Sequence, residues 1–201
     1  SYETTGYTYL NKLYDIYKTE GIVNGTSYNS YEYGTPVDDR LYIKIKDEMY
    51  EYDEVYPELI AQYCNAYYYD DGQNTGSIVY LDTEYETLKS DLKDIAVNSG
   101  SKRVLRYDEN NREKEIRLKP SALMFYNGRR LESFDYSRFS GDGYAKFIDN
   151  DDDGKYEAVH ITNYTYTVVS GTDKFNGRIG DKNGEEFSLD TMLSNRDVSL
   201  S

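Results

Sequence analysis

The sequence predicts a mainly β fold with a minor α component (α+β), in which antiparallel hairpins form small barrel- or sandwich-like units and one helix lies near the N-terminus. Short runs of alternating apolar and polar residues recur along the chain, and turn-forming residues separate them. The aromatic content favours the same class, because 25 of the 201 residues are Tyr and Trp is absent. A ring that carries a hydroxyl suits half-buried strands better than a dry core.

The N-terminal helix is expected over residues 7–20. Leu10, Leu13, Tyr14 and Tyr17 recur there at helical spacing. Gly21 follows at a position where helices commonly end.

Two hairpins are expected after Gly21. Alternating residues 41–45 and the segment 49–52 flank a polar break and form the first. Pro57 opens a short helical turn, and residues 65–69 and 77–81, joined by a turn-rich segment, form the second hairpin.

The chain is expected to divide into two parts, with residues 1–83 holding the helix and the first hairpins and residues 101–201 forming an antiparallel β domain. Residues 84–100 are expected to link these two parts. In this segment, Leu88, Leu92 and Ile95 are expected to form one short helical face.

Turn signals recur in the second part, which is expected to be mostly antiparallel. The strongest is Asn127-Gly128, since both residues tolerate the positive φ of a type I′ turn. Further strands are expected at 144–148, 156–164 and 165–169, and a last hairpin around 182–184.

The net charge of −14 disfavours nucleic acid as a partner, because binding to phosphate depends on Lys and Arg. No apolar run approaches the roughly 18 residues of a membrane span, so no membrane insertion is expected. Residues 102–130 are a basic exception, with nine Lys and Arg against four acids. This segment, with Arg129 and Arg130 at its end, either faces an acidic neighbour or only solvates exposed strands.

Catalytic motifs are scarce. Cys64 is the only cysteine, which excludes a disulfide framework and a Cys-based zinc cluster. His160 is the only histidine and is expected to be a packed or surface residue of a strand. No Gly-x-Ser-x-Gly elbow or Gly-rich phosphate loop is present. We therefore expect no enzyme, although 37 acids leave carboxylate pairs for glycoside cleavage as an alternative.

An acidic loop at residues 149–157 is the clearest chemical feature. Its carboxylates stand at relative positions 1, 3, 5 and 9, with Gly at position 6 and the backbone carbonyl of Lys155 at position 7. The residues concerned are Asp149, Asp151, Asp153 and Glu157. His160 stands where an EF-hand needs Glu, inside an alternating run. We expect a calcium loop of structural role that leads into a strand; the alternative is an acidic hairpin tip that only solvates the chain.

Tyrosines concentrate in the second hairpin. Tyr67, Tyr68 and Tyr69 put rings on both faces of a strand, so one face is expected inside. The other face, with Tyr67 and Tyr69, is a candidate platform for protein or sugar, because Tyr gives a large contact area at low entropy cost. Core packing with chance exposure is the alternative.

Three blocks carry a resemblance to a known family: residues 9–14 with 21–23, residues 125–129, and residues 147–164, which include Asp149 and Gly154-Lys155-Tyr156. In this order they resemble a poorly characterised family of clostridia and related Gram-positive bacteria that occurs beside S-layer homology repeats, and they are similar to segments of large phage virion proteins. Family members usually have an aliphatic residue where Glu157 follows Tyr156 here. The resemblance implies surface-layer, adhesive or virion scaffolding.

The sequence thus predicts a non-catalytic structural or interaction module of a large extracellular, cell-surface or virion assembly. Calcium is expected to stabilise it, and protein partners, including other copies of the chain in a homo-oligomer, are expected to bind it. The alternative is a carbohydrate-binding module that uses exposed tyrosines. Because the chain opens at Ser1, we expect it to be a piece of, or a processed form of, a longer polypeptide.

Overall fold

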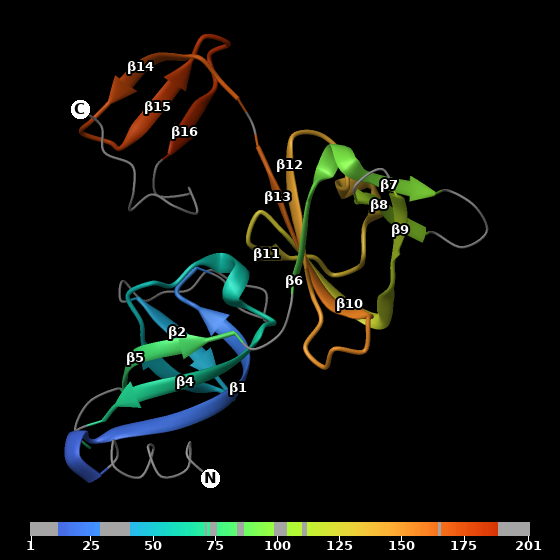
Figure 1. Cartoon of the computed structure of the whole chain (residues 1–201). Helices are drawn as coiled ribbons and strands as arrows, with labels where there is room; N and C mark the ends of the chain where they lie inside the picture. The colour runs from blue at the N-terminus through green and yellow to red at the C-terminus, as the bar shows by residue number, and fades with distance from the viewer. Residues whose placement is uncertain are drawn as a thin grey trace.

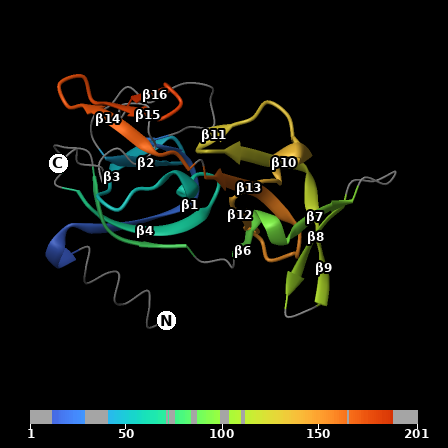
Figure 2. The same ribbon diagram turned by 90° about the horizontal axis from the view of Figure 1, so that it is seen from above.

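A computed structural model describes residues 12–28, 41–70, 72, 76–83, 87–98, 104–109, 112–164 and 166–188. The described part is mainly β, with sheets built mostly from antiparallel strands, as the sequence predicts. Figures 1 and 2 show a barrel in the first part of the chain, a larger sheet beside it, and two small three-stranded sheets.

The barrel is closed and has five strands in the order β1-β2-β3-β5-β4. It closes because β1 pairs antiparallel with both β2 and β4, and β3 meets β5 through a single parallel bridge, Glu51 to Ser77. A short 3-10 helix, η1(Pro57–Leu59), precedes β4, where the sequence predicts a helical turn. The strands are β1(Ile16–Thr26), β2(Tyr42–Ile45), β3(Glu48–Glu51), β4(Tyr63–Tyr69) and β5(Ser77–Asp82).

The barrel core consists of side chains that alternate with exposed positions along these strands. Ile43 and Ile45 of β2 are fully buried, as the alternation predicts. Cys64 is buried with them, and burial raises the pKa of its thiol to about 12, which keeps it a protonated, inert side chain.

The N-terminal helix does not extend over the predicted range. Residues 1–11 lie outside the described part, residues 12–14 form one helical turn, and strand β1 begins at Ile16. Asp15, with φ of 52°, marks the change of direction. Seven consecutive residues of β1 pair with β4, and this pairing overrides the helical spacing of the apolar residues. Gly21, predicted as a helix end, lies inside the strand, where a Cβ would be 2.9 Å from Lys46 Cε.

The larger sheet has the order β11-β10-β13-β12-β6. All neighbours are antiparallel except β10 and β13, which run parallel, an arrangement that the sequence pattern did not predict. Its strands are β6(Thr87–Asp91), β10(Leu118–Tyr126), β11(Arg129–Arg130), β12(Gly143–Ile148) and β13(Tyr156–Asn163). The turn at Asn127-Gly128 joins β10 to β11 with positive φ at both residues, as predicted.

Over its described residues, 87–98, the segment predicted to link the two parts does not form one helix. Leu88 lies in β6, Leu92 begins the 3-10 turn η2(Leu92–Asp94), and Ile95 begins β7(Ile95–Asn98). All three pack against the core of the second part, so their shared apolar face reflects burial rather than a helix. Strand β7 continues into a three-stranded sheet with β8(Val104–Glu109) and β9(Arg112–Ile116).

The last described sheet joins β14(Val169–Asp173), β15(Arg178–Asp181) and β16(Glu186–Ser188). The predicted hairpin around residues 182–184 is the turn between β15 and β16. The predicted strand at 165–169 differs, because β14 begins only at Val169. A third 3-10 turn, η3(Tyr136–Arg138), lies between β11 and β12.

The hairpin of β12 and β13 has two different faces, and both are covered. One face, with Phe147, Val159 and Ile161, packs into the core shared with β7, β8 and β9. The other face, with Ile148 and Ala158, packs against the segment after η1 at Ile60 and Ala61 and against Phe125 of β10. The barrel and the larger sheet therefore share a small apolar core of their own, here called the joint.

Candidate metal site and joint

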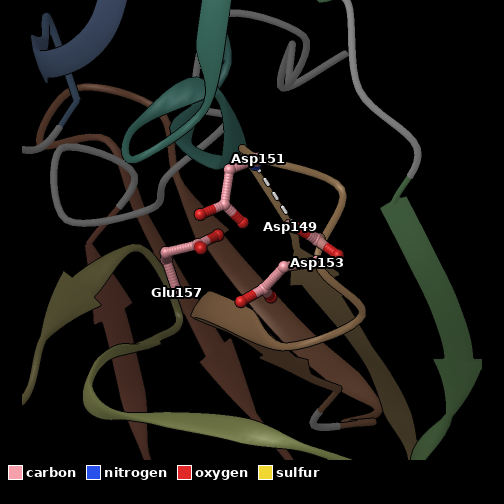
Figure 3. Close-up of side chains that lie close together, drawn as sticks. All are labelled: Asp149, Asp151, Asp153 and Glu157. Carbon is pink, nitrogen blue, oxygen red and sulfur yellow. Dashed lines mark hydrogen bonds between the residues drawn. The ribbon is translucent and has the colours of Figure 1, made fainter.

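The acidic loop connects β12 to β13, and four carboxylates converge in it (Figure 3). Asp149 follows the last residue of β12, and Glu157 lies in β13. Positive φ angles at Asp152 and Gly154 curl the backbone between them. One ligand atom from each of Asp149, Asp151, Asp153 and Glu157 lies within 4.8 Å of the other three. The structure thus brings together the four side chains that the sequence predicts.

Backbone amides hold these carboxylates in place. Asp149, which is 7% exposed, accepts a hydrogen bond from the amide of Gly154 at 2.8 Å. Asp153 accepts one from the amide of Lys155 at 2.8 Å, and Glu157 accepts one from the amide of Asn150 at 2.7 Å. The carboxylates are therefore pre-positioned by the loop, and a hard cation that prefers oxygen ligands suits such a cluster.

Lys119 of β10 also reaches the cluster, and local sequence pattern gave no sign of it because it lies thirty-two residues before Asp151. Its Nζ is 2.6 Å from Asp151 Oδ2 and 3.6 Å from Asp153 Oδ2, and it also contacts Glu157 Oε1. Its hydrogen bond to Asp151 is the main cause that lowers the pKa of that carboxyl. The hydrogen bonds to Asp151 and Glu157 raise the pKa of Lys119 itself. One ammonium thus already contacts three of the four carboxylates and offsets part of their negative charge.

Lys155 has a different place. Its Nζ is 3.5 Å from Asp153 Oδ2, and its side chain is half exposed. Its backbone carbonyl as a metal ligand stays a prediction.

Asn150, the second residue of the loop, binds the barrel. Its side-chain Oδ1 accepts a hydrogen bond from the amide of Tyr63 at 2.8 Å, and its Nδ2 donates to the carbonyl of Ala61 at 2.8 Å. Ala61 has a φ of 70°, which is strained for a residue with a Cβ, and its amide donates to Val23 of β1. The acidic loop is therefore hydrogen-bonded to the backbone at Ala61 and Tyr63, and Ala61 is in turn hydrogen-bonded to β1 of the barrel.

His160 lies at the centre of the joint, as a packed residue of a strand. It is 2% exposed, its ring stacks on Phe125 with centroids 4.5 Å apart, and its Nε2 is 2.8 Å from the carbonyl of Ile60. Because a carbonyl only accepts, Nε2 carries the proton. Loss of solvation on burial lowers the pKa of His160 to about 4, so the ring is neutral at pH 7.

Other polar side chains line the same face of the hairpin. Lys146, opposite His160, places Nζ 3.0 Å from Gln62 Oε1 of the barrel. Glu58 of η1 accepts hydrogen bonds from Tyr144 and Thr162, which pair with each other across β12 and β13. Sequence reasoning singled out none of these three contacts with the barrel, because they join residues 84, 86 and 104 positions apart.

The tyrosines of the second hairpin divide between two sides, as predicted. Tyr68 packs against the barrel core. Tyr67 lies with its ring centroid 6.1 Å from that of Tyr80, which is 58% exposed, and Tyr69 is 44% exposed. The barrel thus presents tyrosine rings on the outer side of β4 and β5.

The basic segment is partly balanced by nearby acids. Arg106 pairs with Glu113 at 3.1 Å, Arg117 pairs with Glu115 at 3.6 Å, and Lys119 binds the acidic loop. Of the two residues predicted to contact a partner, Arg129 is exposed and Arg130 is half-buried in β11. Glu113 and Glu115 belong to the segment itself, so only the contact of Lys119 with the acidic loop makes the segment less basic than its composition indicates.

Comparison with family models, with curated proteins and with solved structures finds no match to this chain. Within the described ranges, no helix has the length and apolar character to cross a membrane.

Proposed function

We propose that this chain is a non-catalytic structural module of a large extracellular, cell-surface or virion assembly, in which calcium bound by the acidic loop stabilises the joint between two β units. The observation that carries the proposal is the loop itself. Four carboxylates converge at residues 149–157, and Asn150, between two of them, is hydrogen-bonded to the barrel backbone.

Calcium is the cation that this donor set favours. It takes six to eight oxygen ligands in flexible geometry, and its extracellular sites have affinities of about 0.1–1 mM. Magnesium demands stricter octahedral geometry and keeps several waters. At millimolar concentration, calcium at such a site would stabilise the fold by roughly 0.4–1.4 kcal/mol.

Lys119 competes with calcium for the carboxylates of the acidic loop. Its ammonium contacts Asp151, Asp153 and Glu157, so an incoming cation must displace it. Without calcium, Lys119 offsets part of the repulsion among the carboxylates. We therefore expect weaker calcium binding than four carboxylates would otherwise give.

Millimolar calcium is expected to raise the melting temperature, and Asp153→Asn is expected to remove the rise. Asp152→Asn is the matched control, because Asp152 carries the same charge in the same loop but lies outside the four-carboxylate cluster. Lys119→Met is expected to enlarge the rise by removing the competing ammonium. Differential scanning calorimetry in calcium and in chelator measures all four chains. Identical melting curves in both buffers, for the parent and for Lys119→Met, would exclude the calcium site.

Assembly is proposed to proceed through protein contacts, with the basic segment of one copy meeting the acidic surface of another. Support comes from the net charge of −14 and from the exposed Arg129 beside a tight turn. Charge contacts at a surface act mainly on the association rate and weaken with salt.

Arg129→Glu is expected to weaken self-association at an ionic strength of about 0.1 M, where the Debye length is about 10 Å, and to have little effect at about 1 M, where it is about 3 Å. Arg178→Glu is the control, because Arg178 is an exposed arginine outside the basic segment, paired with Glu186. Sedimentation velocity across a concentration series measures the effect. A chain that sediments as a monomer at every concentration would contradict this part of the proposal.

A further inference from the structure

A lysine amine and a glutamine carboxamide meet inside the joint. Lys146 of β12 is 9% exposed and Gln62, which directly precedes β4, is 3% exposed. Their Nζ and Oε1 atoms lie 3.0 Å apart, although the residues are 84 positions apart in the chain. The contact therefore joins the barrel to the larger sheet in a region from which water is largely excluded.

The amine has unusual partners for a buried lysine. Buried charges are normally paired with opposite charges, yet among the described residues no ion pair within 4.0 Å involves Lys146. Its other neighbour is the ring of Tyr56, whose centroid is 5.7 Å from Nζ. Burial lowers the pKa of Lys146, which favours the neutral amine. A neutral, desolvated lysine amine is a nucleophile toward carbonyl carbons.

We propose that Lys146 and Gln62 react with each other to form an intramolecular isopeptide bond across the joint. Nζ attacks Cδ of Gln62, and a new C–N bond forms. The bond from Cδ to Nε2 then breaks, and the carboxamide nitrogen leaves as ammonia after taking up a proton that Nζ releases. The reaction consumes no oxidant, water or cofactor, and its products are one secondary amide and one ammonia.

Glu58 acts on the reacting amine through its charge. Its carboxylate acts electrostatically on both Lys146 and His160, and the hydroxyl groups of Tyr144 and Thr162 hold it on the same face of the hairpin. Tyr144 and Lys146 alternate on β12, so both point toward the barrel segment that carries Glu58 and Gln62. Glu58 and Lys146 form no ion pair within 4.0 Å, so the carboxylate acts through its charge: it stabilises the positive charge that develops on Nζ as the amine attacks Cδ.

The bond would also remove the free-energy cost of burying the amine of Lys146. Converting it to an amide removes the charge that burial disfavours. It would close a loop of more than eighty residues and so restrict the unfolded chain in the way that a disulfide does. The proposal stands apart from calcium binding, since it uses no residue of the acidic carboxylate cluster.

Intact mass spectrometry of the purified chain under denaturing conditions tests the proposal directly. The parent chain is expected to be lighter than its sequence mass by one ammonia. After tryptic digestion, the peptides that contain residues 62 and 146 are expected to be joined, with no cleavage after Lys146. A parent chain at its full sequence mass would overturn the proposal without any variant.

Variants then locate the bond. Lys146→Arg and Gln62→Ala are expected to have their full sequence masses. Glu58→Gln keeps both reacting groups and is expected to stay uncrosslinked for longer. Lys89→Met is the matched control, because Lys89 also lies beside this face, with Nζ 3.6 Å from the ring centroid of Tyr144, and it should lose ammonia like the parent. Ammonia loss that persists in Lys146→Arg would place the reaction elsewhere, for example at a succinimide of Asn127-Gly128, and would refute the bond.

Discussion

Replacing Phe125 with Ala is expected to lower the free energy of unfolding by about 3–5 kcal/mol. Phe125 is fully buried, stacks on His160, and packs with Ile60 and Ile148 in the core of the joint. Removing the ring leaves a cavity between the barrel and the larger sheet and strips His160 of its stacking partner. Urea denaturation followed by circular dichroism measures the change.

Phe175→Ala is the control for this prediction. Phe175 is 97% exposed, so the same substitution removes the same atoms without opening a cavity. Its expected effect is within about 0.5 kcal/mol. A loss of less than about 1 kcal/mol in Phe125→Ala would mean that the joint is not a packed core.

Mild acid is expected to destabilise the fold through His160. The pKa of His160 is about 4 in the folded chain and about 6.5 in an unfolded one. Between these values the unfolded state binds the proton and the folded state does not. The contribution of His160 to stability is therefore complete above about pH 6.5 and decreases by about 1.4 kcal/mol per pH unit as pH falls toward 4, a total of about 3 kcal/mol.

The charges around His160 have opposing effects on this loss. Where Lys146 of β12 is charged, it repels the imidazolium and so lowers the pKa of His160, whereas Glu58 of η1 and the hydrogen bond to Ile60 raise it. Urea midpoints across about pH 4.5–7.5 should show the slope in the parent chain and no such slope in His160→Asn, which is less stable throughout. An equal slope in both chains would assign the acid sensitivity to other groups. Carboxyls with lowered pKa values lose their contribution only below the ordinary Asp value; they are Asp135, Asp151, Asp173 and Asp181.

Local features of this chain were predictable because neighbours in sequence produce them. The acidic loop needs only a curled backbone of nine residues, and the turn at Asn127-Gly128 needs only two residues that tolerate positive φ. The mainly β class follows from alternation of the same local kind. The predicted N-terminal helix was wrong only over residues 16–20, because Tyr17 and its neighbours fit a helix as well as a strand, and the pairing partner in β4 decides between them.

Contacts between distant residues could not be read from the sequence. Lys119 reaches the acidic loop only because β10 lies parallel to β13, and nothing local specifies that pairing. In the sequence, Asn150 looks like any other polar loop residue, and only the structure shows its hydrogen bond to the barrel backbone. His160 was expected to be packed, but its bond to Ile60 depends on the joint as a whole.

The order of strands has a consequence for how the chain folds. The barrel needs only residues up to Asp82, and most of its strands pair with near neighbours in sequence. The larger sheet forms later, because β6 pairs with β12 and β10 pairs with β13, and both partners come late in the chain. Since domains generally fold from the N-terminus during synthesis, we expect the barrel to form first. The barrel segment at Ile60 and Ala61 would then already be folded when the hairpin of β12 and β13 packs against it. Early packing of this hairpin would shorten the time during which β6 and β10 have unpaired edges that can aggregate.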